Sequence, residues 1–177
     1  MQSVQQLHDR LLSLALNARE LSLSELSALC ADVAPATHLA VMRQPFLDCV
    51  VDGRKTIESR LTRNRVAPFG LVAPGDAIVF KLAGGPLRGA AVVDAVRSIG
   101  PVQWPVLAAA VREMYSELMM TDDWLELKQG SHYGSFLRLA TPIKLPSVTI
   151  AKTDRRPWVT LVDRRVSRSL PGSLSWV

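Results

Sequence analysis

The chain of 177 residues is 48% hydrophobic and 21% charged, a composition that is typical of a globular domain and excludes a disordered protein. Its longest uninterrupted apolar run, residues 106–111, is far shorter than the roughly 20 residues that a membrane-spanning helix needs. The start of the chain lacks the basic and compact apolar stretches of a secretory signal, so we expect a cytoplasmic protein that does not bind a membrane.

The net charge of +5 is unevenly distributed along the chain. Residues 37–67 carry +3 and residues 144–177 carry +5, whereas residues 1–36 carry −2 and residues 68–143 carry −1. If the fold brings the two basic segments together, they form a face suited to a phosphate-rich partner. A solvated basic surface without a partner explains the same distribution, so both interpretations stay open.

The first 36 residues predict a helical hairpin. Apolar residues at positions 4, 7, 11 and 14 recur at helical spacing and indicate an amphipathic helix over residues 3–19. Ser22 followed by Glu25 is a capping-box pattern, which predicts a second helix that Pro35 ends. We expect the hairpin to pack on the core or to serve as the surface for a homo-oligomer or a protein partner.

From residue 37 onward, short apolar runs alternate with turn residues. The predicted strands are 39–42, 56–61, 77–82, 87–98, 133–139, 147–150 and 158–162. The predicted helices are 46–52, which follows Pro45 and stops at Gly53, and a helix that starts near Pro105 and presents Leu107, Val111, Met114 and Leu118 on one face. Short strands at near-regular spacing, with one or two inserted helices, indicate a small closed or partly closed β-barrel. The domain organisation that follows is a helical extension over 1–36, a barrel domain over 37–162, and a basic, flexible tail over 163–177.

The sequence supports no metal or cofactor site. His8, His38 and His132 have no His or Cys partner at metal-ligand spacing, and Cys30 and Cys49 are too isolated for a zinc site or a disulfide framework. We therefore expect neither a metal nor a cofactor.

The segment from Gly53 to Arg60 concentrates ionisable side chains directly after a glycine turn. In a strand, side chains alternate between two faces, so Thr56, Glu58 and Arg60 share one face, and Ile57 lies on the other with Leu61. Lys55 stands at the entrance of the polar face. This arrangement suits a small polar pocket, although an exposed strand face with paired charges explains the same pattern.

Gly53, Lys55, Glu58 and Arg60 match the G-x-K-x-x-E-x-R signature, and on these residues the sequence resembles the ASCH domain, a relative of the PUA RNA-binding domain. The resemblance covers about residues 37–162. It also includes the Arg-Gln-Pro-Phe lead-in at 43–46, the Pro-Gly-Asp turn at 74–76, the glycine-bearing strand at 88–92, the late strand at 133–139 and the closing segment at 157–159.

The resemblance implies an α+β fold, with a small PUA-like β-barrel flanked by helices and the signature at the mouth of a cleft. It implies binding of RNA or of a nucleoside or nucleotide, and some members of the family are hydrolases. One branch removes the acetyl group from acetylated cytidine with a lysine, a threonine and a distant glutamate. Lys55 matches that lysine, but Glu58 stands where that branch carries threonine, and Thr56 lies two positions earlier. Glu113 and Glu117 are the candidates for the distant glutamate.

The charges around Lys55 bear on its role. A catalytic lysine must lose its proton, which Arg54 and Arg60 favour and a pairing with Glu58 opposes. A lysine held by a carboxylate suits a positioned cation better than a nucleophile. Glu58 could accept a hydrogen bond from an exocyclic amino group, and Arg60 suits a phosphate or a base edge.

The first interpretation is therefore an RNA- or nucleotide-binding protein. An alternative is a small hydrolase that acts through Lys55, Glu58 and Thr56 on an acylated nucleoside or on single-stranded RNA. A third is an interaction module of a regulatory protein. An exposed apolar face on the N-terminal hairpin would favour this interpretation, and a buried apolar face would count against it. Candidate ligand contacts besides Lys55, Glu58 and Arg60 are Arg43 and Gln44 opposite the signature, Tyr133 and Trp158 as stacking aromatics, Ser135, and Arg155 and Arg156 for phosphates.

Overall fold

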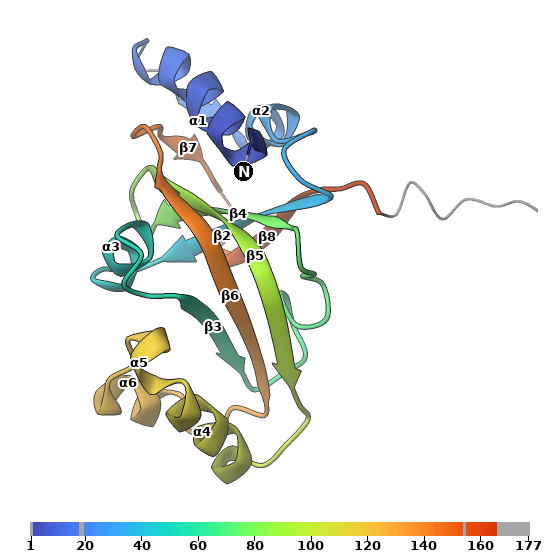
Figure 1. The fold of residues 1–177 in the computed structure, drawn as a ribbon, viewed down its shortest axis with the longest axis vertical. Helices are drawn as coiled ribbons and strands as arrows, with labels where there is room; N and C mark the ends of the chain where they lie inside the picture. Colours follow the sequence, from blue (N-terminus) through green and yellow to red (C-terminus); the bar gives the residue numbers. More distant parts are fainter. Residues whose placement is uncertain (1, 18–19, 154, 166–177) are drawn as a thin grey trace, which may run out of the picture.

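The computed structural model describes residues 2–17, 20–153 and 155–165 of the chain. A mixed sheet of six strands curls into a half-barrel, with α1 and α2 at one end and α4, α5 and α6 at the other (Figure 1). The α+β class and the PUA-like architecture predicted from the sequence are confirmed. The barrel is open, because the strands at the two edges of the sheet, β3 and β8, are not paired with each other.

The strand order in the sheet is β3-β6-β5-β4-β2-β8, and only β2 and β4 pair in parallel. The bounds are β2 Ala36–Met42, β3 Ile57–Thr62, β4 Ala77–Leu82, β5 Leu87–Ile99, β6 Tyr133–Lys144 and β8 Trp158–Asp163. Each strand overlaps a predicted one, although β6 is longer than expected. The β5–β6 ladder shifts register twice, and such irregularities bend a sheet.

The helical insertion between β5 and β6 differs from the single helix expected after Pro105. It contains α4 (Trp104–Glu113), α5 (Tyr115–Leu118) and α6 (Asp122–Leu127), with the first break at Met114. The predicted helix that follows Pro45 is present as α3 (Phe46–Val51). In the described part of the chain, no helix has both the length and the apolar character that a membrane crossing requires.

The N-terminal hairpin consists of α1 (Gln2–Ala15) and α2 (Leu23–Leu29). The predicted capping box is present, since Ser22 Oγ accepts from Glu25 N and the Glu25 carboxylate accepts from Ser22 N. The first helix is shorter than predicted, and residues 18–19 lie outside the described residues. Between the helices, β1 (Leu21–Ser22) pairs with β7 (Ile150–Ala151), so the strand expected over 147–150 is reduced to a two-residue ladder.

Three apolar clusters stabilise these layers. The inside of the half-barrel is filled by side chains such as Phe80 and Leu137, and the outer face of β3 and β6 packs on α4 through Ile57 and Phe136. The third cluster seals the hairpin against the sheet, where its apolar face is buried. This buried face counts against the interpretation as a docking module, and the prediction of a protein partner stays untested.

The segment directly after β8 begins the tail expected over residues 163–177, and its first residues are bonded to the barrel. Arg164 donates from its backbone N to Pro35 O at 2.9 Å. The Arg165 guanidinium donates to Asp163, to Asp76 Oδ2 at 3.1 Å and to Leu71 O at 2.9 Å. The remainder of that tail, residues 166–177, lies outside the described residues.

Candidate functional site

The local sequence delivers the signature residues to the open edge of the half-barrel. Helix α3 ends at Asp52, and Gly53 has a φ of +75°, a conformation that favours glycine and turns the chain away from the helix. Lys55 then donates from its backbone N to Cys49 O at 2.8 Å, which ties the start of β3 to α3. The signature therefore begins at a helix-to-strand turn, as predicted.

Strand β3 has the two faces that the sequence predicts. Ile57 and Leu61 pack in the cluster shared with α4, α5 and α6. Glu58 and Arg60 project from the opposite face, where Arg60 reaches β2 and β8 across the opening of the sheet. One face of this edge strand therefore packs on the helices of the insertion, and the other face carries the charged side chains.

Three side chains form a chain of charges, here called the polar cluster: Lys55, Glu58 and Arg60. Glu58 Oε2 lies 3.6 Å from Lys55 Nζ, and Glu58 Oε1 lies 2.9 Å from Arg60 Nε. The contact with Arg60 is an ion pair rather than an aligned hydrogen bond, because Arg60 Nε has no hydrogen-bond partner. Lys55 and Glu58 are each only 4% exposed, so the carboxylate offsets two cations in a largely water-free setting.

Lys55 is held from a second side by the helical insertion. Its ammonium donates a hydrogen bond of 2.7 Å to Leu118 O at the end of α5. Burial lowers the pKa of Lys55; Glu58 opposes this shift, and Arg60 adds to it. Desolvation is the largest of these effects. The pairing with Glu58 alone would raise the pKa of Lys55, but burial outweighs it and makes loss of the proton easier.

Arg60 is fixed by three neighbours on three strands. Besides Glu58, its Nη2 donates to Val41 O on β2 at 3.0 Å, and its guanidinium carbon lies 5.4 Å from the centre of the Trp158 ring on β8. The guanidinium therefore bridges the two sides of the open half-barrel. Because its position is set before any ligand arrives, it loses little side-chain freedom on binding.

A further cation, Lys128, lies beside this group and was not predicted from the sequence. It forms the C-cap of α6, and its ammonium lies 4.4 Å from the centre of the Trp124 ring. Burial lowers the pKa of Lys128, and repulsion from Arg60 and Arg43 adds to the shift, while Glu58 opposes it. Lys128 therefore lies within electrostatic range of both the polar cluster and the predicted contact Arg43.

Comparisons with solved structures agree with this geometry at the level of the fold. The crystal structure of ASCH from Zymomonas mobilis superposes with a TM-score of 0.57 and 13% identity, covering 76% of this chain and 93% of that chain. The protein has the ASCH fold. Crystal structures of a serine-to-alanine and a tyrosine-to-phenylalanine mutant of the Zymomonas mobilis protein each give a TM-score of 0.56 at 13% identity, over 75% of this chain and 92% and 94% of theirs. No family model matches the sequence, and no curated protein matches it.

Within the ASCH fold, two predicted contacts flank Arg60. Ser135 on β6 is its cross-strand partner and is 2% exposed, so both side chains occupy the same face of the sheet. Trp158 is 3% exposed, and the centre of its ring lies 5.4 Å from the Arg60 guanidinium carbon and 5.6 Å from the centre of the His38 ring. Its ring is thus covered by protein groups, and its Nε1 is buried without a hydrogen-bond partner.

Other predicted contacts lie further from the polar cluster. Gln44 caps α3 by accepting from Asp48 N at 3.3 Å and donating to its carboxylate at 2.9 Å. Tyr133 is the partner of Thr62, two residues beyond Arg60, and packs edge-on against Phe69. Arg43 is exposed at the end of β2, and Arg155 and Arg156 are exposed before β8.

The catalytic alternatives find partial geometric support. Thr56 is half-buried and donates from its backbone N to Glu117 O at 3.1 Å, so the two residues are neighbours. The Glu117 carboxylate is paired with Arg138 at 2.6 Å, and Glu113 is paired with Arg97 at 2.9 Å. Neither carboxylate contacts Lys55 in the described part of the chain. Among the described residues, no group of three His, Cys, Asp or Glu side chains could hold a metal ion.

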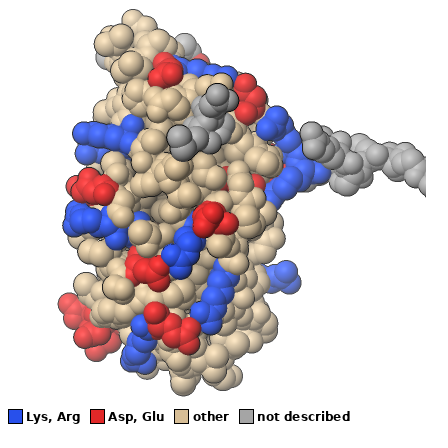
Figure 2. Space-filling view, viewed as in Figure 1, with Lys and Arg blue, Asp and Glu red and all other residues tan. Residues whose placement is uncertain are grey.

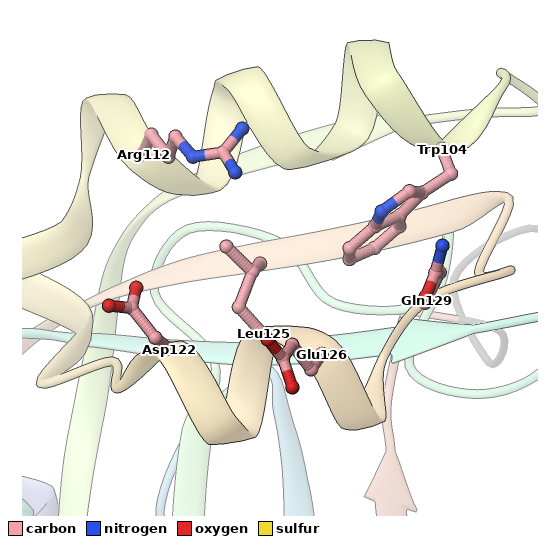
Figure 3. A pocket seen from close by; sticks show the side chains of 6 residues that line it. All are labelled: Trp104, Arg112, Asp122, Leu125, Glu126 and Gln129. Atoms are coloured by element: carbon pink, nitrogen blue, oxygen red, sulfur yellow. The ribbon is translucent and has the colours of Figure 1, made fainter.

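A shallow pocket of about 360 Å³ lies within the insertion, between α4 and α6 (Figure 3). Leu125 and Trp104 reach toward each other across it, and Arg112 and Asp122 lie at one end. Glu126 and Gln129 complete the lining. None of these residues belongs to the signature.

Proposed function

We propose that this protein binds RNA or a nucleotide at the open edge of the half-barrel, with Arg60 as the contacting cation and Lys55 and Glu58 as the residues that position it. The observation that carries this proposal is the fixed Arg60 guanidinium, held by Glu58, Val41 O and the Trp158 ring. A preorganised guanidinium matches a phosphate or the edge of a base, because its planar set of N–H donors fits both. The ASCH fold supports the nucleic-acid interpretation, because the family is thought to bind RNA or nucleotides.

Accessibility favours binding over hydrolysis. The Arg60 side chain is 17% exposed, whereas that of Lys55 is 4% exposed and is tied to Leu118 O. A ligand therefore meets Arg60 first. For Lys55 to act as a base or a nucleophile, α5 or Arg60 would have to move aside.

The second candidate is a hydrolase that acts through Lys55 on an acylated nucleoside or on single-stranded RNA. The observation in its favour is the burial that lowers the Lys55 pKa, since a neutral lysine can accept a proton or attack a carbonyl. Thr56 and Ser135 are the neighbouring hydroxyls that such a reaction could use.

The test compares binding and single-turnover hydrolysis in one set of variants. The ligands are acetylated cytidine, cytidine and a short single-stranded RNA. We expect Arg60→Met to weaken RNA binding by about 1.5–3 kcal/mol, the value of a charged hydrogen bond, and Arg60→Lys to retain part of the affinity. Arg97→Met is the matched control, because Arg97 is an exposed arginine paired with Glu113 and should leave binding unchanged.

Lys55→Arg separates the two candidates, because a guanidinium stays protonated and serves as neither base nor nucleophile. Turnover in the wild type that Lys55→Arg abolishes, with binding intact, would establish the hydrolase and overturn the binding proposal. Binding without turnover on all three ligands supports the binding proposal. Thermal unfolding of each variant checks that lost binding does not reflect a lost fold.

A further inference from the structure

A buried polar pair lies next to the Trp158 ring. The centre of the His38 ring on β2 lies 5.6 Å from the centre of the Trp158 ring. His38 Nε2 lies 3.3 Å from Asp76 Oδ2, and both of these side chains are fully buried. His38 Nδ1 lies 3.1 Å from Thr160 Oγ1 on β8. Because both ring nitrogens have a partner, the His38 ring is fixed where it contacts Trp158.

The charge of Asp76 is compensated by an arginine outside the sheet. Arg165, two residues beyond the end of β8, donates from Nη1 to Asp76 Oδ2 at 3.1 Å. Ala73 N donates to the same oxygen at 2.8 Å, whereas within the described part of the chain Asp76 Oδ1 is buried without a hydrogen-bond partner. A buried carboxylate that loses a cationic partner is costly, so it reorients toward another donor or toward water. Arg165 therefore holds Asp76, and through it His38, in place.

A line of direct contacts connects Arg165 to Arg60. Asp76 and His38 are its first two links, and the Trp158 ring is the third, with its centre 5.4 Å from the Arg60 guanidinium carbon. Protein interiors are close-packed, so a displaced side chain shifts its neighbours. The Arg165 side chain is 34% exposed, while those of Asp76 and His38 are 0% exposed. The end of the line that lies away from Arg60 is thus accessible from outside the protein.

We infer that Arg165 is a positioning residue for Arg60, which acts through Asp76, His38 and Trp158. The segment directly after β8 thereby controls ligand affinity without contacting the ligand. This inference rests on the proposed function and adds a means of regulating it. Any event that detaches Arg165 from Asp76 releases the Trp158 ring and lowers the affinity while the site stays open.

The experiment replaces Arg165 in the full chain and follows both Trp158 and RNA binding. We expect Arg165→Met to shift the NMR signal of the Trp158 indole N–H and to weaken binding of a short single-stranded RNA about fivefold, within the range of coupling between neighbouring residues. Arg165→Lys keeps a cation near Asp76 and should restore part of the affinity. Because the chain has four tryptophans, Trp158→Phe identifies the signal.

Arg164→Met is the matched control. Arg164 ties the same segment to the barrel, since its Nη2 donates to Ala34 O at 2.9 Å, but among the described residues its side chain forms no ion pair with Asp76. This variant should leave both the Trp158 signal and the affinity unchanged. Thermal unfolding of each variant distinguishes a displaced side chain from a lost fold.

A double variant, Arg60→Met with Arg165→Met, separates positioning from a direct ligand contact. If Arg165 acts through Arg60, the double variant should bind RNA as weakly as Arg60→Met alone. Losses that add up would mean that Arg165 acts on the ligand independently of Arg60.

Three results would overturn the inference: an unchanged Trp158 signal in Arg165→Met, an equal loss of affinity in Arg164→Met, or additive losses in the double variant. If Arg60→Met weakens RNA binding but Arg165→Met does not, the inference fails and the proposed function stands. If Arg165→Met shifts the Trp158 signal but Arg60→Met leaves binding unchanged, the link between Arg165 and Trp158 stands and the proposed function fails.

Discussion

At the scale of single residues, the polar cluster places charges where water is largely excluded. Removing an ion from water costs several kcal/mol unless partners compensate it. Lys55 has two partners, the Glu58 carboxylate and Leu118 O, from different elements. The orientation of α5 and the position of Arg60 therefore depend on the same buried lysine and glutamate.

The lowered pKa of Lys55 leads to a prediction about stability and pH. Burial holds the folded-state pKa below the unfolded value of 10.5, so between the two values the unfolded chain binds a proton that the folded protein does not. The free energy of unfolding of the wild type, relative to Lys55→Met, should therefore rise with pH as it approaches 10.5 and level off above it. Denaturant titrations across this alkaline range measure the effect.

Lys144→Met serves as the reference in the same titrations, because it also removes one lysine but at an exposed position. A relative stability that falls with rising pH would contradict the prediction. It would mean that attraction by Glu58 outweighs burial and raises the Lys55 pKa.

The sequence predicts individual site residues only where they share one strand. The alternation along β3 is local, so the shared face of Glu58 and Arg60 follows from the period of two. Lys128 is more than sixty positions away, and its approach to Arg60 depends on how α6 packs on α3, which no local pattern reveals. The burial of the Trp158 ring beneath Arg60 likewise follows from the curl of the sheet.

At the scale of elements, short sequence motifs predict a helix end correctly where the residues at that end determine it. The capping box at Ser22 and the glycine stop at Gly53 both lie at observed helix ends. The sequence does not predict the break at Met114, because apolar residues continue at helical spacing on both sides of it. Long-range hydrogen bonds accompany that break, since Leu118 O and Glu117 O accept from Lys55 Nζ and Thr56 N.

The docking of the N-terminal hairpin can be tested through Cys30. This thiol is buried in the same apolar cluster as Leu7, and burial raises its pKa to about 12, so it should resist alkylation in the folded protein. Leu7→Ala creates a cavity that costs about 2–5 kcal/mol, so the Cys30 labelling rate should rise about 30-fold or more through local opening. Mass spectrometry separates this site from Cys49.

Leu12→Ala on the same helix is the matched control, because Leu12 is 47% exposed and its loss should leave the labelling rate nearly unchanged. Equal labelling rates in the two variants would show that the hairpin does not depend on the buried face of α1.

At the scale of the whole molecule, the net positive charge is spread among acidic groups. The face shown in Figure 2 intersperses Lys and Arg side chains with Asp and Glu side chains. An anionic ligand on this face would therefore meet cations and carboxylates side by side rather than a uniform basic surface, despite the overall charge of +5.

This mixture of charges predicts a limited dependence of RNA binding on salt. Each phosphate contact on a single strand contributes a slope of about −0.7 in log affinity against log salt, so a contact through Arg60 alone gives about −0.7. Replacing Arg155 should reduce the steepness by about 0.7 if that arginine also contacts a phosphate. Affinities measured from low to physiological salt give the slope, and binding that does not change with salt would remove the electrostatic argument.

The helical insertion leaves the sheet after Ile99 and returns at Tyr133, and Ile99 is the partner of Gly134 in the β5–β6 ladder. Its entry and exit points are therefore neighbours in space. Residues 100–132 are therefore one insertion whose two ends are held together by the β5–β6 ladder. Because this insertion supplies Lys128 and the carbonyl that holds Lys55, but not Arg60, a change in its length or sequence alters the surroundings of Lys55 and leaves the strand that carries Arg60 intact.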